Sequence, residues 1–220
     1  MSLEALKPAA KMKTVGKTPY RQIRALFDEE TITVYQAYSD EIALAAVEQQ
    51  SLSASPLFKP TRFTWIKPSW AWMMYRSGYS YKDRGQTRIL ALRMKHEHFR
   101  QILRQATVTG HSGEPLTADE RSKLVRVQWD PERNLRLGAL PFRSIQIGIG
   151  GEASKVWAES MIVSIEDVTE KTRALKKALE ENPAVDEDEL FELGLAPLER
   201  VYDVPNDLRK ILEMGVEADE

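Results

Sequence analysis

The sequence contains no cysteine and only three histidines, which are His96, His98 and His111. Without cysteine the chain has no disulfide, no thiolate nucleophile and no cysteine-ligated zinc, and so few imidazoles make a transition-metal site unexpected. No run of about 18 apolar residues occurs, and no apolar segment follows the lysines of the N-terminus. We therefore expect a cytoplasmic protein without a metal, a membrane span or a secretory signal.

Sequence motifs of familiar chemistry are missing as well. The chain has no Walker-type or Rossmann glycine pattern, no nucleophile elbow and no internal repeat. A functional site therefore has to be sought in local clusters of charged and aromatic side chains.

Acidic residues are scarce in the middle of the chain and abundant at its end, although the net charge is only −2. Residues 59–104 hold eleven cations and two acids, whereas residues 152–220 hold eight cations and nineteen acids. So large an excess of positive charge in the middle segment predicts an anionic partner, either a nucleotide or a nucleic acid. The acidic segment predicts a solvated or masking role.

Residues 62–79 contain no acid at all, but they contain three cations and three of the five tryptophans. The pattern predicts a short strand that leads into a helix. Because the first N–H groups of a helix have no internal partners, the helix start beside Lys67 and Ser69 is a candidate anion site, and we expect Lys67 and Arg76 to line one concave surface. The alternative is that Trp70 and its neighbours at helical spacing are core residues and that the cations are solvated.

Patterns of strands and helices follow one another along the chain without a βαβ period. Strands are predicted at 31–38, 63–66, 87–94, 125–130, 143–149 and 161–165, and helices at 41–50, 69–76, 96–105, 152–159 and 172–179. This order predicts an α+β fold with a mostly antiparallel sheet flanked by helices. The pattern allows either one continuous sheet or a split sheet.

The predicted domain is a single unit over residues 20–180. We expect residues 1–19 to be a mobile basic arm, and residues 181–220 to be an acidic C-terminal extension with a short helix. The extension is expected to be dispensable for folding, because it has few apolar residues and mostly one sign of charge.

Strict alternation in two late strands separates an apolar face from a polar face. The apolar positions are Val125, Val127 and Trp129 in one strand and Ile145, Ile147 and Ile149 in the other. Gln146 therefore lies on the polar face, and if that face is covered, its amide needs partners, which a ligand can supply. The alternative is a glutamine that faces solvent or bonds to a neighbouring loop.

Several blocks of residues resemble a known family. They are Arg21-Gln22-Ile23-Arg24, Val34-Tyr35-Gln36-Ala37-Tyr38, Thr64-Trp65-Ile66-Lys67-Pro68-Ser69, Trp72-Met73-Met74-Tyr75-Arg76-Ser77-Gly78, Val125-Arg126-Val127-Gln128-Trp129-Asp130-Pro131-Glu132-Arg133 and Arg143-Ser144-Ile145-Gln146-Ile147-Gly148. Together they resemble the family called domain of unknown function 4291, over roughly residues 21–169. The resemblance names a family without an activity.

The order of elements is also similar to the ADP-ribosyltransferase fold, in which three strands surround NAD. This similarity implies a catalytic group formed by Tyr35, Thr64 and Gln146, converging on the floor of a cleft, with NAD as the cofactor. Most such transferases place a glutamate on the late strand, where this chain has Gln146. An amide can hydrogen-bond a ribose, but it cannot act as a carboxylate base.

The leading functional interpretation is a basic, aromatic-lined cleft that binds a nucleotide or another phosphorylated ligand, with ADP-ribosyltransferase-like activity as its enzymatic form. The predicted ligand-binding residues are Arg21, Arg24, Gln36, Trp65, Lys67, Ser69, Arg76, Arg126, Gln128, Arg143 and Ser144.

Two other interpretations remain open. One is an RNA or single-stranded nucleic-acid module, in which exposed tryptophans stack on bases and cations contact phosphates. Those cations are Arg62, Lys67, Arg76, Arg84, Arg88 and Arg93. The other is an interaction protein whose acidic tail docks on the basic centre. The sequence leaves the substrate and the oligomeric state undetermined.

Overall fold

The structure of the protein is a computed structural model that describes residues 18–110 and 115–215. The predicted mobile arm therefore lies outside the described residues, apart from its last two positions. No helix in the described ranges is both long enough and apolar enough to cross a membrane.

In the described part of the chain, nine strands form three sheets. The strands are β1 (Arg24–Ala25), β2 (Thr31–Tyr38), β3 (Thr64–Ile66), β4 (Arg88–Lys95), β5 (Ala106–Val108), β6 (Val125–Arg133), β7 (Ala139–Ile149), β8 (Ile162–Asp167) and β9 (Arg200–Val201). The order β2-β4-β8 makes an antiparallel sheet of three, β3-β7-β6-β5 makes a sheet of four, and β1 pairs with β9. Only β5 and β6 run parallel among the pairs of these named strands. The predicted α+β fold with a mostly antiparallel, split sheet is confirmed.

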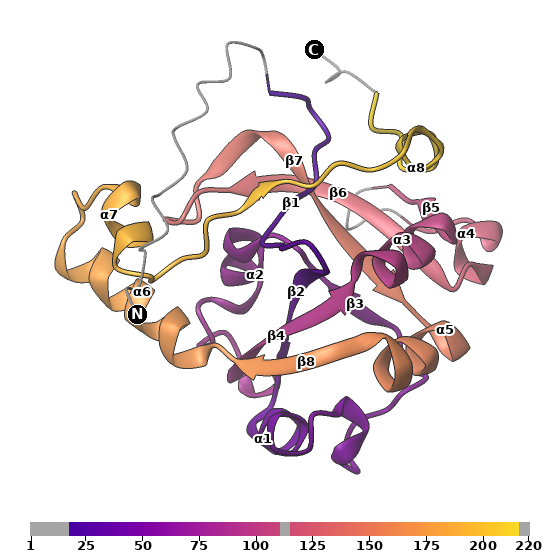
Figure 1. Cartoon of the computed structure of the whole chain (residues 1–220), viewed down its shortest axis with the longest axis horizontal. Helices are drawn as coiled ribbons and strands as arrows, with labels where there is room; N and C mark the ends of the chain where they lie inside the picture. Colours follow the sequence, from indigo (N-terminus) through magenta and orange to yellow (C-terminus); the bar gives the residue numbers. More distant parts are fainter. Residues whose placement is uncertain (1–17, 111–114, 216–220) are drawn as a thin grey trace, which may run out of the picture.

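Helices flank the sheets on several sides. They are α1 (Asp40–Gln49), α2 (Trp70–Ser77), α3 (His96–Arg104), α4 (Ala118–Ser122), α5 (Gly151–Val156), α6 (Thr169–Glu181), α7 (Glu187–Glu192) and α8 (Asn206–Ile211). Short helical turns cover Leu52–Ala54, Arg84–Gln86 and Trp157–Met161. In Figure 1, α6 and α7 lie on one flank of the molecule, α3, α4 and α8 lie on the opposite flank, and α1 lies beside β8.

The alternation predicted for β6 and β7 sets the position of the core. All six predicted apolar positions on these strands are at most 2% exposed. They pack with the buried faces of β2 and β4 and with side chains of α3 and α8 in one hydrophobic cluster. The opposite face of β6 and β7 is therefore the polar face of the four-stranded sheet.

The two larger sheets meet where β2 passes β3. The backbone N–H of Tyr35 donates to the carbonyl of Lys67 at 2.7 Å, and the N–H of Lys67 donates to the carbonyl of Tyr35 at 3.1 Å. Beside this bridge, the side-chain amide of Gln36 donates to the hydroxyl of Thr64. Lys67 is thus held at the junction of the two sheets, at the end of β3 and just before α2.

The C-terminal segment packs into the domain, contrary to the prediction that it buries little apolar area. After α7 it crosses the molecule to α8, adding β9 beside β1 on the way (Figure 1). Its buried residues are Val185, Leu190, Ala196, Tyr202, Val204, Leu208 and Leu212. The indole N–H of Trp129 donates to the carbonyl of Leu212 at 2.9 Å, so the segment also satisfies a buried donor of β6. The reason given for its dispensability is therefore wrong.

Candidate functional site

A cleft of about 850 Å³ opens where the two sheets diverge. Its walls come from the end of β2, from β3, from α2, from the polar face of β6 and β7, and from the loops before β3 and before β4. Seven of the predicted site residues line it, namely Gln36, Thr64, Trp65, Lys67, Arg76, Gln128 and Gln146. The expectation that Lys67 and Arg76 line one concave surface is therefore confirmed.

Positive charge predominates in the cleft. Four cations, Lys59, Arg62, Lys67 and Arg76, line it among the described residues, against one acid, Asp83. Lys59, Arg62 and Arg76 are exposed at the rim, whereas Lys67 lies at the bottom and is 3% exposed. The arrangement attracts an anion to the mouth and places a buried ammonium or amine at the end of its path.

Burial lowers the pKa of Lys67 to about 7, with the nearby guanidinium of Arg76 as the second cause. The carboxylate of Asp130 acts in the opposite direction, but its effect is the smallest of the three. The amine forms no ion pair with any residue in the described ranges, and its hydrogen bond to the carbonyl of Trp65 is long, at 3.5 Å. A buried lysine whose charge is so poorly compensated is a marker of a functional site.

Arg76 is held in place from across the mouth of the cleft. Its guanidinium donates to the side-chain oxygen of Gln86 at 3.0 Å, and Gln86 in turn donates to Asp83. Because Arg76 lies in the last turn of α2, the helix sets its position, while the turn at 84–86 sets its direction.

Aromatic rings form a second part of the lining. Tyr38, Phe58, Phe63 and Trp65 line the cleft, and the rings of Phe63 and Trp65 are tilted against each other at 5.6 Å. Phe63 packs directly over Gly148 of β7, where a Cβ would come within 2.3 Å of its ring. Any larger residue at position 148 would displace this wall, so the glycine gives the aromatic rings their place.

Side-chain amides form the floor. Gln146 is 8% exposed, and its amide nitrogen donates to Asp130 at 2.7 Å and to Gln128 at 3.0 Å. The prediction that protein partners or a ligand hold this amide is confirmed for the protein partners. Because a carboxylate only accepts, Asp130 fixes the NH₂ end of Gln146, and the amide oxygen is left for a ligand.

Asp130 was not among the predicted site residues, although the strict alternation of β6 puts it on the same face as Gln128. That alternation was the signal that could have found it. Tyr38 was missed in the same way, since it shares a face of β2 with Gln36 and donates to the side-chain oxygen of Gln36 at 2.6 Å. In both cases the missed residue lies two positions from a predicted site residue on the same strand, so the strand period of two places both side chains on one face.

The start of α2, predicted as an anion site, is already filled by the protein. The N–H of Trp70 donates to the carboxylate of Glu199 at 2.6 Å, and Ser69, fully buried, caps the helix by accepting from the N–H of Trp72. The Ser69 hydroxyl donates to Glu132 at 2.8 Å. An external anion therefore has no access to this helix start, and the expectation placed on Ser69 is wrong.

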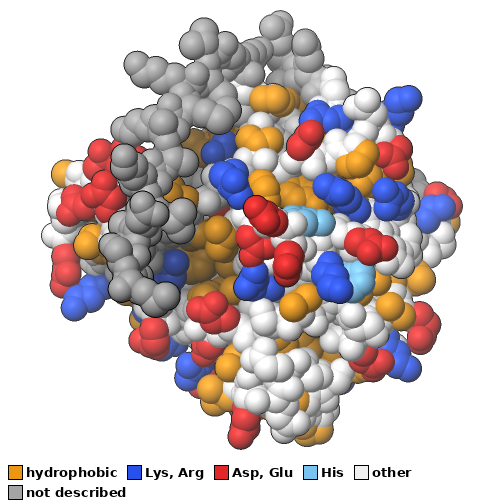
Figure 2. All heavy atoms as spheres, in the orientation of Figure 1, with side chains coloured by type: hydrophobic (Ala, Val, Ile, Leu, Met, Phe, Trp, Pro, Cys, Tyr) orange, Lys and Arg blue, Asp and Glu red, His pale blue; other side chains and the backbone are white. Residues whose placement is uncertain are grey.

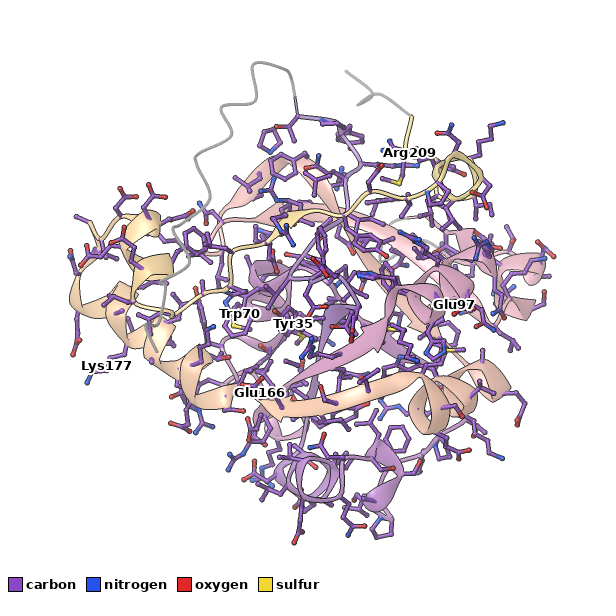
Figure 3. The ribbon with its side chains drawn as sticks, viewed as in Figure 1. Tyr35, Trp70, Glu97, Glu166, Lys177 and Arg209 are labelled. Carbon is purple, nitrogen blue, oxygen red and sulfur yellow. The ribbon has the colours of Figure 1, made fainter. Side chains whose placement is uncertain are left out.

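Tyr35 does not lie in the cleft. Side chains alternate along β2, so Gln36 and Tyr38 face the cleft while Tyr35 points to the other side, where its ring packs against Trp70 at 5.3 Å. Figure 3 shows these two residues close together near the middle of the view. Tyr35 lines a smaller hollow of about 310 Å³ on that side. The predicted convergence of Tyr35, Thr64 and Gln146 is thus wrong for Tyr35.

Five further predicted ligand-binding residues are engaged elsewhere and do not line the cleft. Arg21 pairs with Glu213 at 2.8 Å, Arg143 bonds to the hydroxyl of Tyr20 at 2.7 Å, and Arg24 lies over the ring of Phe142. Arg126 lies 4.4 Å from the ring centroid of Phe63, behind the aromatic wall, and Ser144 is buried. Arg126, Arg143 and Ser144 belong to β6 and β7, as Gln128 and Gln146 do, whereas Arg24 lies on β1 and Arg21 just before it.

Several of the residues on which the nucleic-acid interpretation depends are buried or paired. All five tryptophans lie in the described ranges, and Trp70, Trp72, Trp129 and Trp157 are buried, so stacking on unpaired bases is left to Trp65. Arg88 is paired with Asp40 and Asp167, and Arg93 lines the smaller hollow beside Asp28. Figure 2 shows acids and cations interspersed on the face it presents. The expectation of several exposed tryptophans is therefore wrong, while nucleic-acid binding itself stays a prediction.

Within the parts of the chain that the structure describes, no three histidine, aspartate or glutamate side chains gather in an arrangement that could hold a metal ion. Among the described residues, the polar groups that line the cleft are side-chain amides, hydroxyls, the four cations and the carboxylate of Asp83.

Comparison with known proteins gives a match to a protein family. The model of a family described as Domain of unknown function (DUF4291) matches residues 22–202. The match includes every residue that lines the cleft and extends through β9. No curated protein matches the chain at a meaningful level of similarity.

Proposed function

The chain belongs to the DUF4291 family, whose description names no activity, and we propose that its cleft binds a nucleotide or a related phosphorylated ligand. The observation that carries the proposal is the convergence of Lys67 and Arg76 on one cleft, without a carboxylate that pairs with either within the described ranges. Two cations held near each other without counter-ions are stabilised when an anion enters between them.

The remaining lining favours a nucleotide over a simple anion. Phe63 and Trp65 offer ring faces on which a base can stack, and the amides of Gln36, Gln128 and Gln146 offer donors and acceptors for a ribose or a base edge. The volume of the cleft, about 850 Å³, lies near the upper end of the usual range for small-molecule sites.

Among nucleotides, we propose NAD, because of the similarity of element order to the ADP-ribosyltransferase fold. Breaking the bond between nicotinamide and ribose creates positive charge on the sugar, which a negative group must stabilise. Gln146 presents an amide oxygen in this role, and Asp130 adds a carboxylate one hydrogen bond behind it. The pair Gln146 and Asp130 is thus the proposed substitute for a strand glutamate.

Isothermal titration calorimetry with NAD, ADP-ribose and a single-stranded RNA tests the proposal. We expect saturable binding of ADP-ribose or NAD with one site per chain. Arg76→Gln should weaken this binding about tenfold or more, equivalent to about 1.4 kcal/mol. Lys67→Met should weaken the binding to a similar extent, because each of the two variants removes one cation that contacts the phosphate.

Matched controls come from cations outside the cleft. Lys177 projects from α6 at the edge of the molecule, paired with Glu181 at 3.7 Å (Figure 3), and Arg104 is exposed on α3. Lys177→Met and Arg104→Gln should bind as the wild type does. Equal losses in all four variants, or RNA binding in place of nucleotide binding, would overturn the proposal.

A further inference from the structure

Lys67 is far more buried than Lys59, the other lysine among the described residues that line the cleft. Lys59 is exposed, whereas the amine of Lys67 lies at the bottom, with the long contact to the carbonyl of Trp65 as its hydrogen bond. An ammonium in such a place costs far more than a neutral amine, because it has lost water and forms no ion pair with a residue in the described ranges. The neutral form carries a free electron pair and is a nucleophile.

The surroundings of Lys67 select what this nucleophile can meet. Arg76 lies close enough to lower its pKa, and Arg62 and Lys59 line the same cleft. These charges bind the phosphate of a ligand and hold the rest of it against the floor. In the antiparallel β3–β7 register Ile66 pairs with Ile147, so Lys67, which follows Ile66, lies opposite Gln146. The amide of Gln146 bonds Asp130, which brings that carboxylate to the same place.

We propose that Lys67 attacks the carbonyl carbon of a phosphorylated aldehyde or ketone in the cleft and forms an imine with it. This inference deepens the proposed function and rests on it, because the cations that bind the phosphate deliver the carbonyl group. The class of substrate is then a phosphorylated carbonyl compound, which includes the open-chain form of a ribose phosphate or of ADP-ribose.

The step balances without an oxidant or a reductant. The electron pair of the amine forms a C–N bond while the carbonyl oxygen takes up a proton, which gives a carbinolamine. The nitrogen then loses a proton, the hydroxyl takes up a second proton and leaves as water, and the C=N bond forms as a protonated imine that releases its proton. Solvent supplies and accepts these protons, because the exposed rim residues leave the cleft open to water.

Lys171 provides an internal comparison. It is also partly buried, and burial lowers its pKa too, but it lines the smaller hollow, where its amine lies 5.6 Å from the ring centroid of Trp70. If a desolvated amine alone were enough, Lys171 would react with aldehydes as Lys67 does. If phosphate anchoring decides, only Lys67 reacts quickly with a phosphorylated aldehyde.

The test is reductive trapping on the full chain at pH 8. Pyridoxal phosphate serves as the phosphorylated aldehyde, cyanoborohydride reduces any imine to a stable secondary amine, and peptide mass spectrometry locates the adduct. We expect Lys67 to be labelled about tenfold or more faster than Lys59 or Lys171, which corresponds to about 1.4 kcal/mol. Pyridoxal without the phosphate should lose this preference, and ADP-ribose should give an adduct at Lys67 as well.

Lys67→Arg removes the nucleophile and should lose the fast adduct, whereas Lys171→Arg should keep both the fast adduct at Lys67 and the binding of ADP. Lys67→Met, checked for folding by circular dichroism, is the second variant for loss of the adduct, and competition by ADP is measured on the wild type. Labelling spread evenly over lysines would overturn the inference. If ADP competes with pyridoxal phosphate but no adduct forms at Lys67, the imine fails and the nucleotide site stands; if neither ligand binds, both fail.

Discussion

At the scale of single residues, the ionisation of Lys67 links the fold to its function. Its pKa is about 7 in the folded chain, below the ordinary 10.5. Between these values the folded state binds fewer protons than the unfolded state, so the free energy of unfolding rises with pH across this window. The cost arises because burial disfavours the ammonium, and the charge of Asp130 offsets only part of that effect.

Lys67→Met should therefore stabilise the fold more at low pH than at high pH. The gain in the free energy of unfolding should be larger at pH 6 than at pH 9 by roughly 2 kcal/mol, since methionine carries no charge to desolvate. Urea unfolding at both pH values measures this difference. Lys177→Met, at an exposed position, should show no such difference, and parallel pH profiles for Lys67→Met and the wild type would contradict the assigned ionisation.

Gln146 can be tested by two replacements that separate binding from charge. Gln146→Ala removes the amide that bonds Asp130 and should weaken ADP-ribose binding about tenfold. Gln146→Glu places a second carboxylate against Asp130, so one proton should be shared between them, and stability should fall as the pH rises and that proton is lost. If the cleft is a transferase site, the added carboxylate should also raise NAD turnover. Unchanged binding and stability in both variants would remove Gln146 from the site.

At the scale of elements, the start of α2 shows how a distant segment completes a local structure. Glu199 accepts the N–H of Trp70, 129 residues earlier in the chain. Burial raises the pKa of Glu199 well above its ordinary value, and the neighbouring Glu132 raises it further. A helix start favours negative charge, but here desolvation and the second carboxylate outweigh that preference.

Glu199→Gln should stabilise the fold at neutral pH by about 1 kcal/mol, because the amide oxygen still accepts from Trp70 without carrying a charge. A carboxyl with a raised folded pKa loses stability as the pH rises from its ordinary value through the raised one, so the variant should also flatten the pH profile above pH 4.5. Thermal unfolding between pH 5 and 8 measures both effects. Glu192→Gln, on the exposed side of α7, is the control, and a loss of stability in Glu199→Gln would reverse the assignment.

The C-terminal segment is the second element whose role only the structure gives. Leu208 on α8 is fully buried, whereas Leu198 in the preceding stretch is 64% exposed. Leu208→Ala should cost about 2 to 4 kcal/mol, and Leu198→Ala should cost little. A chain that stops after Asn182 loses the whole set of buried residues and should lose its cooperative unfolding transition. A truncated chain with a melting temperature close to that of the full chain would restore the original expectation of a dispensable extension.

Strand periodicity predicted most of the fold and only part of the site. The alternation of β6 and β7 placed these strands and their buried faces correctly, because one covered face imposes the period of two. The same rule shows why Tyr35 and Gln36, adjacent in β2, could not both face the cleft. The short parallel strand β5 was not predicted.

At the scale of the whole molecule, the segregation of charge along the chain has a spatial meaning that only part of the sequence analysis predicted. The basic middle segment supplies the cations of the cleft, as expected. The acidic end of the chain does not simply mask them: Glu199 and the residues around it fill the start of α2 on the side away from the cleft floor. Contacts this distant in sequence follow from tertiary packing, which local pattern does not encode.

A crystal structure of the chain with ADP-ribose tests the central claim most directly. The account predicts a diphosphate between the amine of Lys67 and the guanidinium of Arg76, with the adenine against Phe63 or Trp65 and a ribose within reach of the Gln146 oxygen. Density for the ligand in the smaller hollow beside Tyr35 and Trp70, or an empty cleft at a ligand concentration that saturates binding in solution, would contradict it.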